Sequence, residues 1–303
     1  MPSSLTLAQL RVFDAVAKNS SFSRAAEKLS VSQPYISGQI AGLEAHLGVP
    51  LFNRVGRRAY LSEAGKLLTP YAESILNTLN EARQSLQDYS GLVTGHLVIA
   101  ASSTPGTYLA PRLLGQFLAD YPGVQITLQI LDRMQVEQTI LKQEAEIGIV
   151  ASQPDSSELS VEPLGLDEMV LVVGSNHPWV NRASIDIHEL REERLISRER
   201  TSGTRIRVDQ EFSRVGIEPR SILELTNTEA IKEAVAAGLG VAFLSERAVR
   251  HEITSQRLIA VRLMGQKLTR PICLLMLQGR KLSTAANILR NLILADFLSS
   301  QHR

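Results

Sequence analysis

The apolar positions of the first twenty residues follow a helical period. Leu7, Leu10, Phe13 and Val16 recur at three-residue steps, which predicts a helix with one buried face. The polar run at 19–21 (Asn-Ser-Ser) then ends the pattern, so the chain is expected to leave the helix there.

Two further helices are expected after this break, joined by a tight turn. The first covers 24–29, with Ser23 as its cap. Its residues that are small or apolar enough for close packing are Ala25, Ala26 and Leu29. Ser32 is the expected cap of the next helix, which carries Pro34 in its first turn and stops at Gly48. Its apolar positions are Ile36, Ile40, Leu43 and Leu47.

Two short helices joined by a tight turn make a helix-turn-helix, whose second helix enters the DNA major groove by its N-terminal residues. A glutamine side chain makes paired hydrogen bonds to adenine, and a serine hydroxyl donates to bases or phosphates. The candidate DNA contacts on this helix are therefore Ser32, Gln33, Pro34, Tyr35 and Ser37. On helix geometry alone, a helical core with solvated charges is an equal alternative.

A basic turn between two apolar anchors follows the third helix. The anchors are Leu51-Phe52 and Tyr60-Leu61, and Gly56 lies at the centre of the turn. This pattern is typical of a β-wing, which presents arginines to phosphates or to the minor groove. The candidate DNA contacts of the wing are Arg54, Arg57 and Arg58.

A narrow apolar stripe continues for about three heptads beyond Gly65. Its members are Leu68, Tyr71, Ile75, Leu79, Ala82, Leu86 and Tyr89. A stripe this narrow does not enclose a core by itself and needs a partner. The partner is either the rest of the chain or a second copy of this helix.

From His96 onward, short apolar runs alternate with helical patterns. Strands are expected at 97–102, 124–131, 146–151, 169–173, 195–197, 241–244 and 272–277. One helical stretch is expected to end at 119. Further helices are expected at 134–143, 205–215, 229–237 and 285–298. This alternation predicts α/β units with largely parallel sheets, and 200 residues allow two subdomains.

Two hydroxyl-rich segments each follow a predicted strand of this body and begin the helix that comes next. The dipole and unpaired N–H groups at a helix N-terminus favour an anion, and such sheets bind ligands at the C-terminal ends of their strands. The candidate ligand contacts are Ser102, Ser103, Thr104, Thr201, Ser202, Gly203 and Thr204. Ordinary helix capping is the rival explanation for each segment taken singly.

Composition and charge narrow the function. The formal net charge is +1, yet residues 1–66 hold eight basic and four acidic side chains, which favours a polyanion-binding module on a slightly acidic body. The one cysteine, Cys273, lies in an apolar run and is expected in the core. The six histidines show no metal-ligand spacing, and no phosphate-binding glycine motif is present, so we expect no metal, no cofactor and no enzymatic activity. The N-terminus has no signal-peptide pattern and no run is long enough to span a membrane, which predicts a cytoplasmic protein.

The segment SFSRAAEKLSVSQPYISGQIAGLEAHLGVPLFNRVGRRAYLSEAG, residues 21–65, resembles the winged helix-turn-helix of the LysR-type transcriptional regulators. The resemblance covers 6–66 almost position for position. It implies that the helix from Ser32 reads bases and that 54–58 is the wing. Gly38, Ala41 and Gly42 depart from the pattern, because basic residues are common at these positions in the family.

The resemblance extends to the architecture. It implies a winged helix-turn-helix at 1–66, a linker and dimerisation helix at 67–90, and an effector-binding domain at 91–303 that is similar to periplasmic solute-binding proteins. Subdomain I would comprise about 95–165 and 270–303, and subdomain II about 166–269, with crossing strands near 164–170 and 265–272. By position, the matching effector contacts are Ser102, Thr104, Thr201 and Ser202.

The family also implies partners. These are double-stranded DNA with an imperfect dyad, a small polar or anionic effector, a second copy of the chain in a dimer, a tetramer of two such dimers, and RNA polymerase. Two other functions fit parts of the sequence. A solute-binding protein or enzyme would use the N-terminal helices only for assembly, and an architectural DNA-binding protein would leave the α/β body unexplained.

Overall fold

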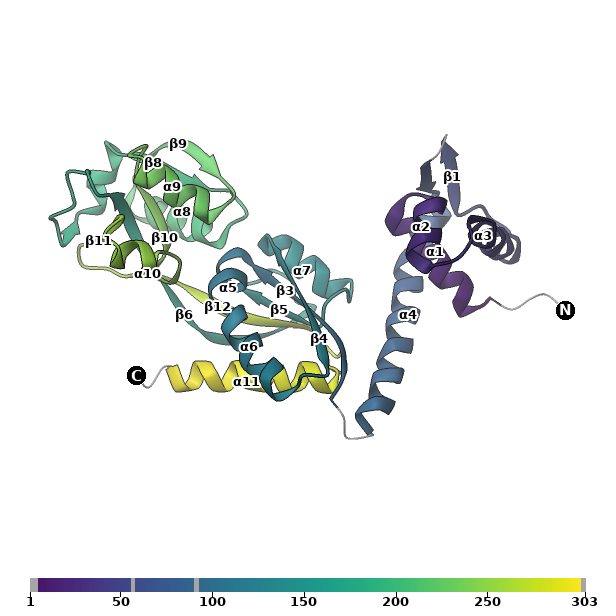
Figure 1. The fold of residues 1–303 in the computed structure, drawn as a ribbon. Helices are drawn as coiled ribbons and strands as arrows, with labels where there is room; N and C mark the ends of the chain where they lie inside the picture. The colour runs from purple at the N-terminus through teal and green to yellow at the C-terminus, as the bar shows by residue number, and fades with distance from the viewer. Residues whose placement is uncertain (1–4, 56–57, 90–92, 301–303) are drawn as a thin grey trace. The chain divides into compact units, whose positions relative to one another are not determined.

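The computed structural model describes residues 5–55, 58–89 and 93–300, and the chain separates into two compact units, Met1–Gly91 and Leu92–Arg303 (Figure 1). Each unit has its own hydrophobic core, so each is described separately. Among the described residues, no helix combines the length and apolar character that a membrane span requires.

The N-terminal unit is a winged helix-turn-helix followed by a long helix. Its elements are α1 (Leu7–Asn19), α2 (Phe22–Leu29), α3 (Gln33–Leu47), β1 (Phe52–Val55), β2 (Arg58–Leu61) and α4 (Glu63–Tyr89). The side chains of α1 and α3 supply most of its core, including the fully buried Phe13 and Leu43. The antiparallel hairpin β1–β2 closes this core with Phe52, which lies opposite Leu61.

Two details of the first helices correct the sequence prediction. Ser21, rather than Ser23, caps the second helix, which starts at Phe22, because the Ser21 backbone is extended and its hydroxyl accepts from the Arg24 N–H at 3.4 Å. Leu7 is exposed, since residues nine apart lie on opposite sides of a helix and Val16 occupies the buried side.

The outer apolar anchor of the wing also differs from the prediction. Tyr60 is exposed, whereas its strand neighbour Ala59 is buried. Successive side chains of a strand point to opposite faces, so only alternate positions of β2 reach the core.

The C-terminal unit contains the predicted α/β body. Its strands are β3 (Gly95–Ser102), β4 (Val124–Leu131), β5 (Ile147–Val150), β6 (Leu159–Gly174), β7 (Ser184–Ile185), β8 (Arg194–Arg198), β9 (Arg220–Leu225), β10 (Ala242–Ser245), β11 (Leu258–Leu263) and β12 (Leu268–Leu277). Its helices are α5 (Ser103–Tyr108), α6 (Ala110–Asp120), α7 (Arg133–Leu141), the 3-10 turn η1 (Ile187–Arg191), α8 (Gly203–Val215), α9 (Thr228–Ala236), α10 (Glu246–Thr254) and α11 (Thr284–Ser300). The sequence prediction missed β7, η1, β9, α10 and β11.

Two long strands, β6 and β12, run antiparallel through the middle of this unit and belong to both halves (Figure 1). On one side, β12 pairs with β5, which continues through β3 to β4. On the other side, β6 pairs with β10 and β11. The strands β3, β4 and β5 are parallel, but every pairing of β6 and β12 is antiparallel, so the sheet is mixed rather than largely parallel.

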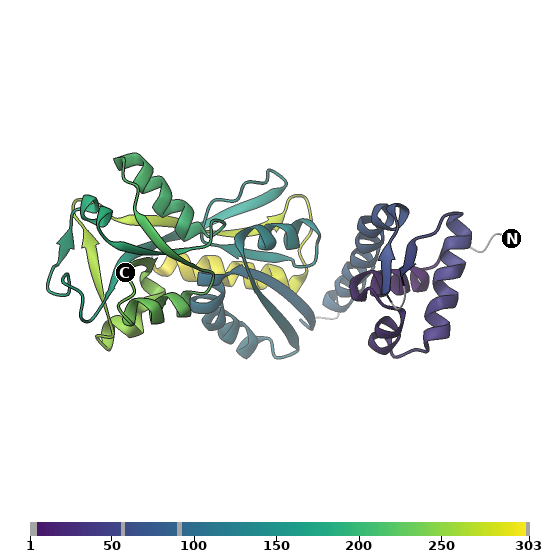
Figure 2. The ribbon, with the colours of Figure 1, turned by 90° about the horizontal axis from the view of Figure 1, so that it is seen from above.

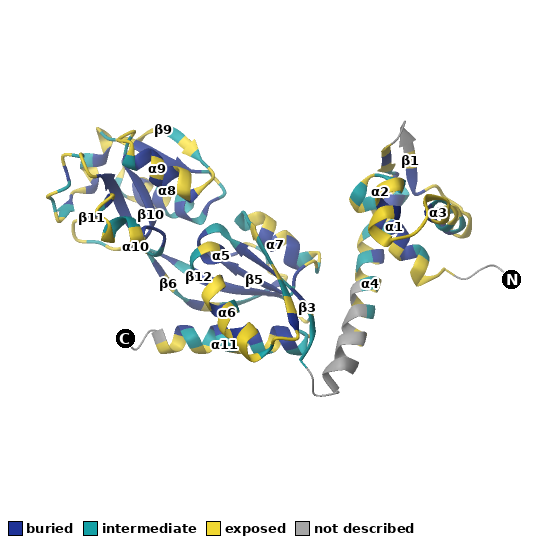
Figure 3. Cartoon of the chain, viewed as in Figure 1, coloured by how far each residue is buried: buried dark blue, intermediate teal, exposed yellow. Residues whose placement is uncertain are grey.

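Each half is a layered structure with helices on both faces of its strands. In the first half, called subdomain I below, α6 and α11 cover one face and α7 covers the other. In the second half, subdomain II, α8 covers one face, and α9 and α10 cover the other. The strands are buried between these layers (Figure 3), and α11 runs along subdomain I (Figure 2).

The predicted helical stretch that ends at 119 is two helices. The first, α5, stops at Tyr108, and α6 restarts at Ala110 with Pro111 in its first turn. Proline lacks an N–H group and its ring clashes with the preceding turn, so it begins a helix and does not continue one.

Candidate functional site

The first turn of α3 presents polar side chains to solvent. Ser32 caps the helix and accepts a hydrogen bond from the Tyr35 N–H at 3.3 Å, as the sequence predicts. Gln33, Pro34 and Tyr35 are exposed, and the Gln33 amide donates to the Ser37 hydroxyl at 3.3 Å. None of these side chains is buried in the core, so their polar groups remain available to a partner.

The wing is held against α3 by a carboxylate. One oxygen of Glu44 accepts hydrogen bonds from the N–H groups of Leu51 and Phe52 at 2.7 and 3.2 Å. Arg58 is exposed on β2, opposite Val55 in the hairpin. Arg57 lies outside the described residues, and so does the side chain of Arg54.

The helix α4 has two apolar faces with different surroundings. Leu68, Ala72 and Leu76 pack against the core of the winged domain. The neighbouring residues Leu67, Tyr71 and Ile75 recur at four-residue steps and are 72, 68 and 44% exposed. Only the first of these two faces is covered by the chain's own N-terminal unit.

In the C-terminal unit, a cleft lies where the two subdomains meet at the ends of their strands. Its lining residues are Ser102, Ser103, Thr104, Leu131, Asp132, Arg133, Ala151, Ser152, Arg198, Glu199, Ser202, Gly203 and Arg270. The structure thus brings both predicted hydroxyl-rich segments to one place. Of the predicted contacts, Thr204 lies directly behind the lining and Thr201 is not part of it.

Helix capping does not account for these hydroxyls. Ser102 and Ser202 occupy the N-cap positions of α5 and α8, but neither side chain caps its helix. The Ser102 hydroxyl instead accepts a hydrogen bond from the Ala151 N–H at 3.2 Å. The first N–H groups of α5 and α8 therefore lack a side-chain cap, which favours an acceptor or anion from outside.

The floor of the cleft is a buried ion pair between the two crossing strands. Arg270 on β12 lies directly opposite Asp167 on β6, and two of its nitrogens contact one Asp167 oxygen at 2.8 and 2.9 Å. The same guanidinium donates to the hydroxyls of Thr104 and Thr204 at 3.0 and 2.7 Å. Asp167 also accepts from the Ser245 hydroxyl at 2.7 Å.

This cluster positions both helix N-termini on one charged centre. Burial lowers the pKa of Arg270, opposed by the charge of Asp167, but an arginine stays charged in proteins. The sequence reasoning missed Arg270 and Asp167. The sequence did hold a signal for them. Of the two segments predicted to cross, the one near 164–170 contains the acidic Asp167 and the one near 265–272 contains the basic Arg270.

Two further arginines line the cleft, and each is paired with carboxylates. Arg133 contacts Asp155 at 2.6 Å and Glu137 at 3.3 Å. Burial raises the pKa of the Glu137 carboxyl, whereas the hydrogen bond and charge of Arg133 lower the pKa of Asp155. Arg198 makes a two-point contact with Glu199 and donates to the Thr228 hydroxyl at 3.2 Å.

Two buried polar atoms of the lining residues, Arg133 Nε and the Ser152 hydroxyl, have no hydrogen-bond partner among the described residues. The hydroxyl of Ser152 is buried and makes no hydrogen bond within the described chain. Unsatisfied buried polar groups are rare in native proteins, so this hydroxyl marks a position where a ligand or a water belongs.

The remaining chemistry is structural. Cys273 is buried in the core of subdomain I, as predicted, and burial raises the pKa of its thiol. Within residues 5–55, 58–89 and 93–300, no group of three or more His, Cys, Asp or Glu side chains is arranged to hold a metal ion.

Comparisons with known proteins agree with both halves of this picture. The model of a bacterial regulatory helix-turn-helix protein of the lysR family matches residues 7–66, and the LysR substrate binding domain matches residues 90–298. A probable RuBisCO transcriptional regulator of Trichormus variabilis is 36% identical over 298 residues, which cover 96% of this chain and 88% of that protein.

Solved structures resemble the chain as well. The regulatory domain of CcmR from Synechocystis PCC6803, in complex with 2-PG, is 30% identical with a TM-score of 0.64, over 67% of this chain and 98% of that one. Full-length CbnR in complex with its target DNA shares the fold, with a TM-score of 0.71 at 23% identity, over 95% of this chain and 99% of CbnR.

The buried ion pair makes a first prediction. Asp167→Asn leaves Arg270 as an unpaired buried charge, and we expect a loss of about 3–5 kcal/mol in the free energy of unfolding. Urea unfolding of the full chain, followed by the fluorescence of the one tryptophan, Trp179 in the core of subdomain II, measures this loss.

The control is the neighbouring substitution Glu168→Gln, which breaks an exposed pair with Lys267 and should cost about 1 kcal/mol or less. Equal effects of Asp167→Asn and Glu168→Gln would contradict the role assigned to the buried pair.

Proposed function

Because the chain belongs to the LysR family of transcriptional regulators, it is a DNA-binding regulator and not an enzyme, and we propose that a small anion in its cleft controls its output. The observation that carries this proposal is the meeting of two uncapped helix N-termini, an unpartnered hydroxyl and three arginines in one cleft. A cytoplasmic location belongs to the same proposal, because the partner is DNA.

The proposed DNA contacts divide into two kinds. Base contacts come from the first turn of α3, where exposed polar side chains have no role in the core. They are assigned to Ser32, Gln33, Pro34, Tyr35 and Ser37. Phosphate and minor-groove contacts are assigned to the wing residues Arg54, Arg57 and Arg58. The proposed operator has an imperfect dyad, because a symmetric dimer reads two half-sites.

The proposed dimer forms through α4. Its exposed residues Leu67, Tyr71 and Ile75 make an apolar face that the N-terminal unit leaves uncovered, and a second copy of the helix would bury it. Two dimers form the proposed tetramer, and RNA polymerase is the proposed further partner at the promoter.

The proposed effector is a small molecule with a phosphate or carboxylate group. The uncapped N–H groups of α5 and α8 supply donors, and Ser152 and Ser202 add hydroxyls. The relative CcmR, at 30% identity, was solved in complex with 2-PG, which makes this compound the first probe. The relatives that are named RuBisCO transcriptional regulators make a RuBisCO promoter the first DNA fragment to test.

Substitutions in the two DNA elements should behave differently. We expect Gln33→Ala to lose about 1–3 kcal/mol of discrimination between operator and random DNA, because it removes a base contact. Arg58→Ala should weaken binding to both DNAs equally and reduce the salt dependence by about one ion. Fluorescence anisotropy with both duplexes over a range of salt concentrations measures these effects.

The matched control is Arg262→Ala, which removes an exposed arginine from the C-terminal unit and should leave DNA affinity unchanged. An equal loss on operator and random DNA for Gln33→Ala would rule out its role as a base contact.

The dimer proposal predicts a charge-sensitive helix face. Tyr71→Glu combined with Ile75→Glu should raise the dimer dissociation constant at least about thirtyfold, because two carboxylates would be buried in an apolar interface. Analytical ultracentrifugation measures the constant. Lys66→Glu, on the opposite side of α4, is the control and should leave it near the wild-type value.

An unchanged dissociation constant in the Tyr71→Glu, Ile75→Glu variant would mean that α4 pairs through another face or not at all.

The effector proposal predicts an unusual phenotype for Ser152→Ala. Binding of 2-PG to the full chain should weaken about tenfold, whereas the ligand-free protein should be at least as stable, because the hydroxyl makes no hydrogen bond to lose. Isothermal titration calorimetry and urea unfolding measure the two properties. Ser221→Ala, which removes a hydroxyl paired with Ser197 outside the cleft lining, is the control.

Shikimate, a carboxylate without phosphate, serves as the second probe. Binding of shikimate but not of 2-PG would restrict the effector class to carboxylates. Tight 2-PG binding that is indifferent to Ser152→Ala and Ser202→Ala would contradict the proposed cleft.

A further inference from the structure

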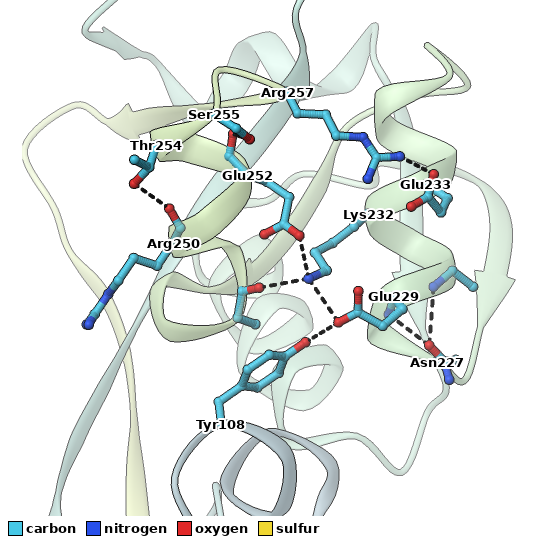
Figure 4. Close-up of polar contacts among 12 residues, drawn as sticks. Tyr108, Asn227, Glu229, Lys232, Glu233, Arg250, Glu252, Thr254, Ser255 and Arg257 are labelled. Carbon is cyan, nitrogen blue, oxygen red and sulfur yellow. Dashed lines mark hydrogen bonds and ion pairs between the residues drawn. The ribbon is translucent and has the colours of Figure 1, made fainter. Parts of the chain in front are cut away.

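The two subdomains also touch at a second place, at the far end of α5 from the cleft. Tyr108, the last residue of α5 in subdomain I, donates a hydrogen bond of 2.5 Å to Glu229 at the start of α9 in subdomain II. Figure 4 shows the tyrosine hydroxyl pointing at this carboxylate. Asn227 caps α9 and accepts from the Glu229 N–H at 2.8 Å, which holds the backbone of Glu229 in place.

A buried lysine supports the carboxylate from behind. Lys232 Nζ lies 2.9 Å from Glu229, 2.7 Å from Glu252 on α10 and 3.1 Å from the carbonyl of Ala248 (Figure 4). The same ammonium group is 5.7 Å from the centre of the Tyr108 ring. The contact therefore joins one helix of subdomain I to two helices of subdomain II.

The protonation states keep this contact intact near neutral pH. Burial and the hydrogen bond to Glu229 raise the pKa of Tyr108 to about 12, so its hydroxyl keeps the proton it donates. Burial would raise the pKa of Glu229, but the hydrogen bonds from Tyr108 and Lys232 outweigh burial and lower it. Burial would lower the pKa of Lys232, but its bonds to Glu252 and Glu229 raise it.

The cleft is open to solvent but narrow. The space inside it that a water-sized group can occupy is about 20 Å³, which is about that of one such group. A phosphate or carboxylate group is larger than this space, so the lining has to widen to accept one. The helix α5 is only six residues long, with Ser103 and Thr104 at the cleft and Tyr108 at the second contact. One short helix therefore carries residues of both places where the subdomains meet.

We propose that Tyr108, Glu229 and Lys232 form a latch that holds the two subdomains closed when the cleft is empty. The latch rests on the proposed function, because it controls access to the proposed effector cleft. A ligand that separates the subdomains breaks the hydrogen bond between Tyr108 and Glu229. The observed binding free energy of the effector is then weaker than its own contacts with the cleft would give. The difference is the free energy needed to open the latch.

The opening is measured without any ligand. Cysteines placed at Gln116 on α6 and Gln210 on α8, both exposed, carry nitroxide labels in the full chain, one on each subdomain. Cys273 is buried and its thiol pKa is raised, so it stays unlabelled in the folded protein. Pulsed electron–electron double resonance then gives the distribution of distances between the subdomains.

We expect Tyr108→Phe to raise the long-distance population about fivefold, because it removes only the hydroxyl that bridges the subdomains. Tyr121→Phe removes a hydroxyl elsewhere in subdomain I and is the control, with no expected change. Glu229→Gln should act in the same direction, because a neutral amide oxygen is a weaker acceptor for the Tyr108 hydroxyl than a carboxylate oxygen. The double variant should add less than the sum of the two, since both changes break one contact.

Wild-type distances in both Tyr108→Phe and Glu229→Gln, or equal shifts in Tyr108→Phe and Tyr121→Phe, would overturn the latch. In a second measurement, Tyr108→Phe should lower the dissociation constant of 2-PG by up to about fivefold, the factor by which it raises the long-distance population. Weaker binding in this variant would show that the ligand needs the closed contact and would also overturn the latch. Failure of wild-type protein to bind 2-PG would contradict the effector class alone, because the ligand-free distances decide the latch.

Discussion

Arg270 and Asp167 lie opposite each other on the two strands that cross between the subdomains, and both are almost fully buried. On β12, Leu268 belongs to the core of subdomain II and Ile272 to the core of subdomain I. The ion pair therefore occupies the point where one apolar core ends and the other begins. A buried charge is tolerated only with a well-placed partner, so this pair restricts how the two strands align.

The construction of the cleft follows from that pair. The hydroxyls of Thr104 and Thr204 both accept hydrogen bonds from the Arg270 guanidinium, so the first turns of α5 and α8 are held at the same centre from opposite subdomains. The hydroxyls around them face a small space whose floor is already neutralised by Asp167. The anion proposed for this cleft would therefore interact with the helix N-termini rather than with a bare cation.

The N-terminal unit depends on shorter contacts. Glu44 ties the start of the wing to the end of α3, while the cap at Ser32 sets where α3 begins. Both ends of α3 are thus held by residues close to it in sequence, and its first turn is exposed. Beyond it, α4 covers the winged core with one face and keeps a second apolar face free.

The sequence by itself determined the features that depend on near neighbours. The cap at Ser32, the stop at Gly48, the wing, the alternation of strands with helices, and the two hydroxyl-rich segments were all visible as local patterns. The cap of α2 is Ser21 in the structure, where the sequence pattern predicted Ser23. Only the tertiary structure paired Arg270 with Asp167 and Tyr108 with Glu229, because these partners are 103 and 121 residues apart and no local period records which distant strands and helices meet.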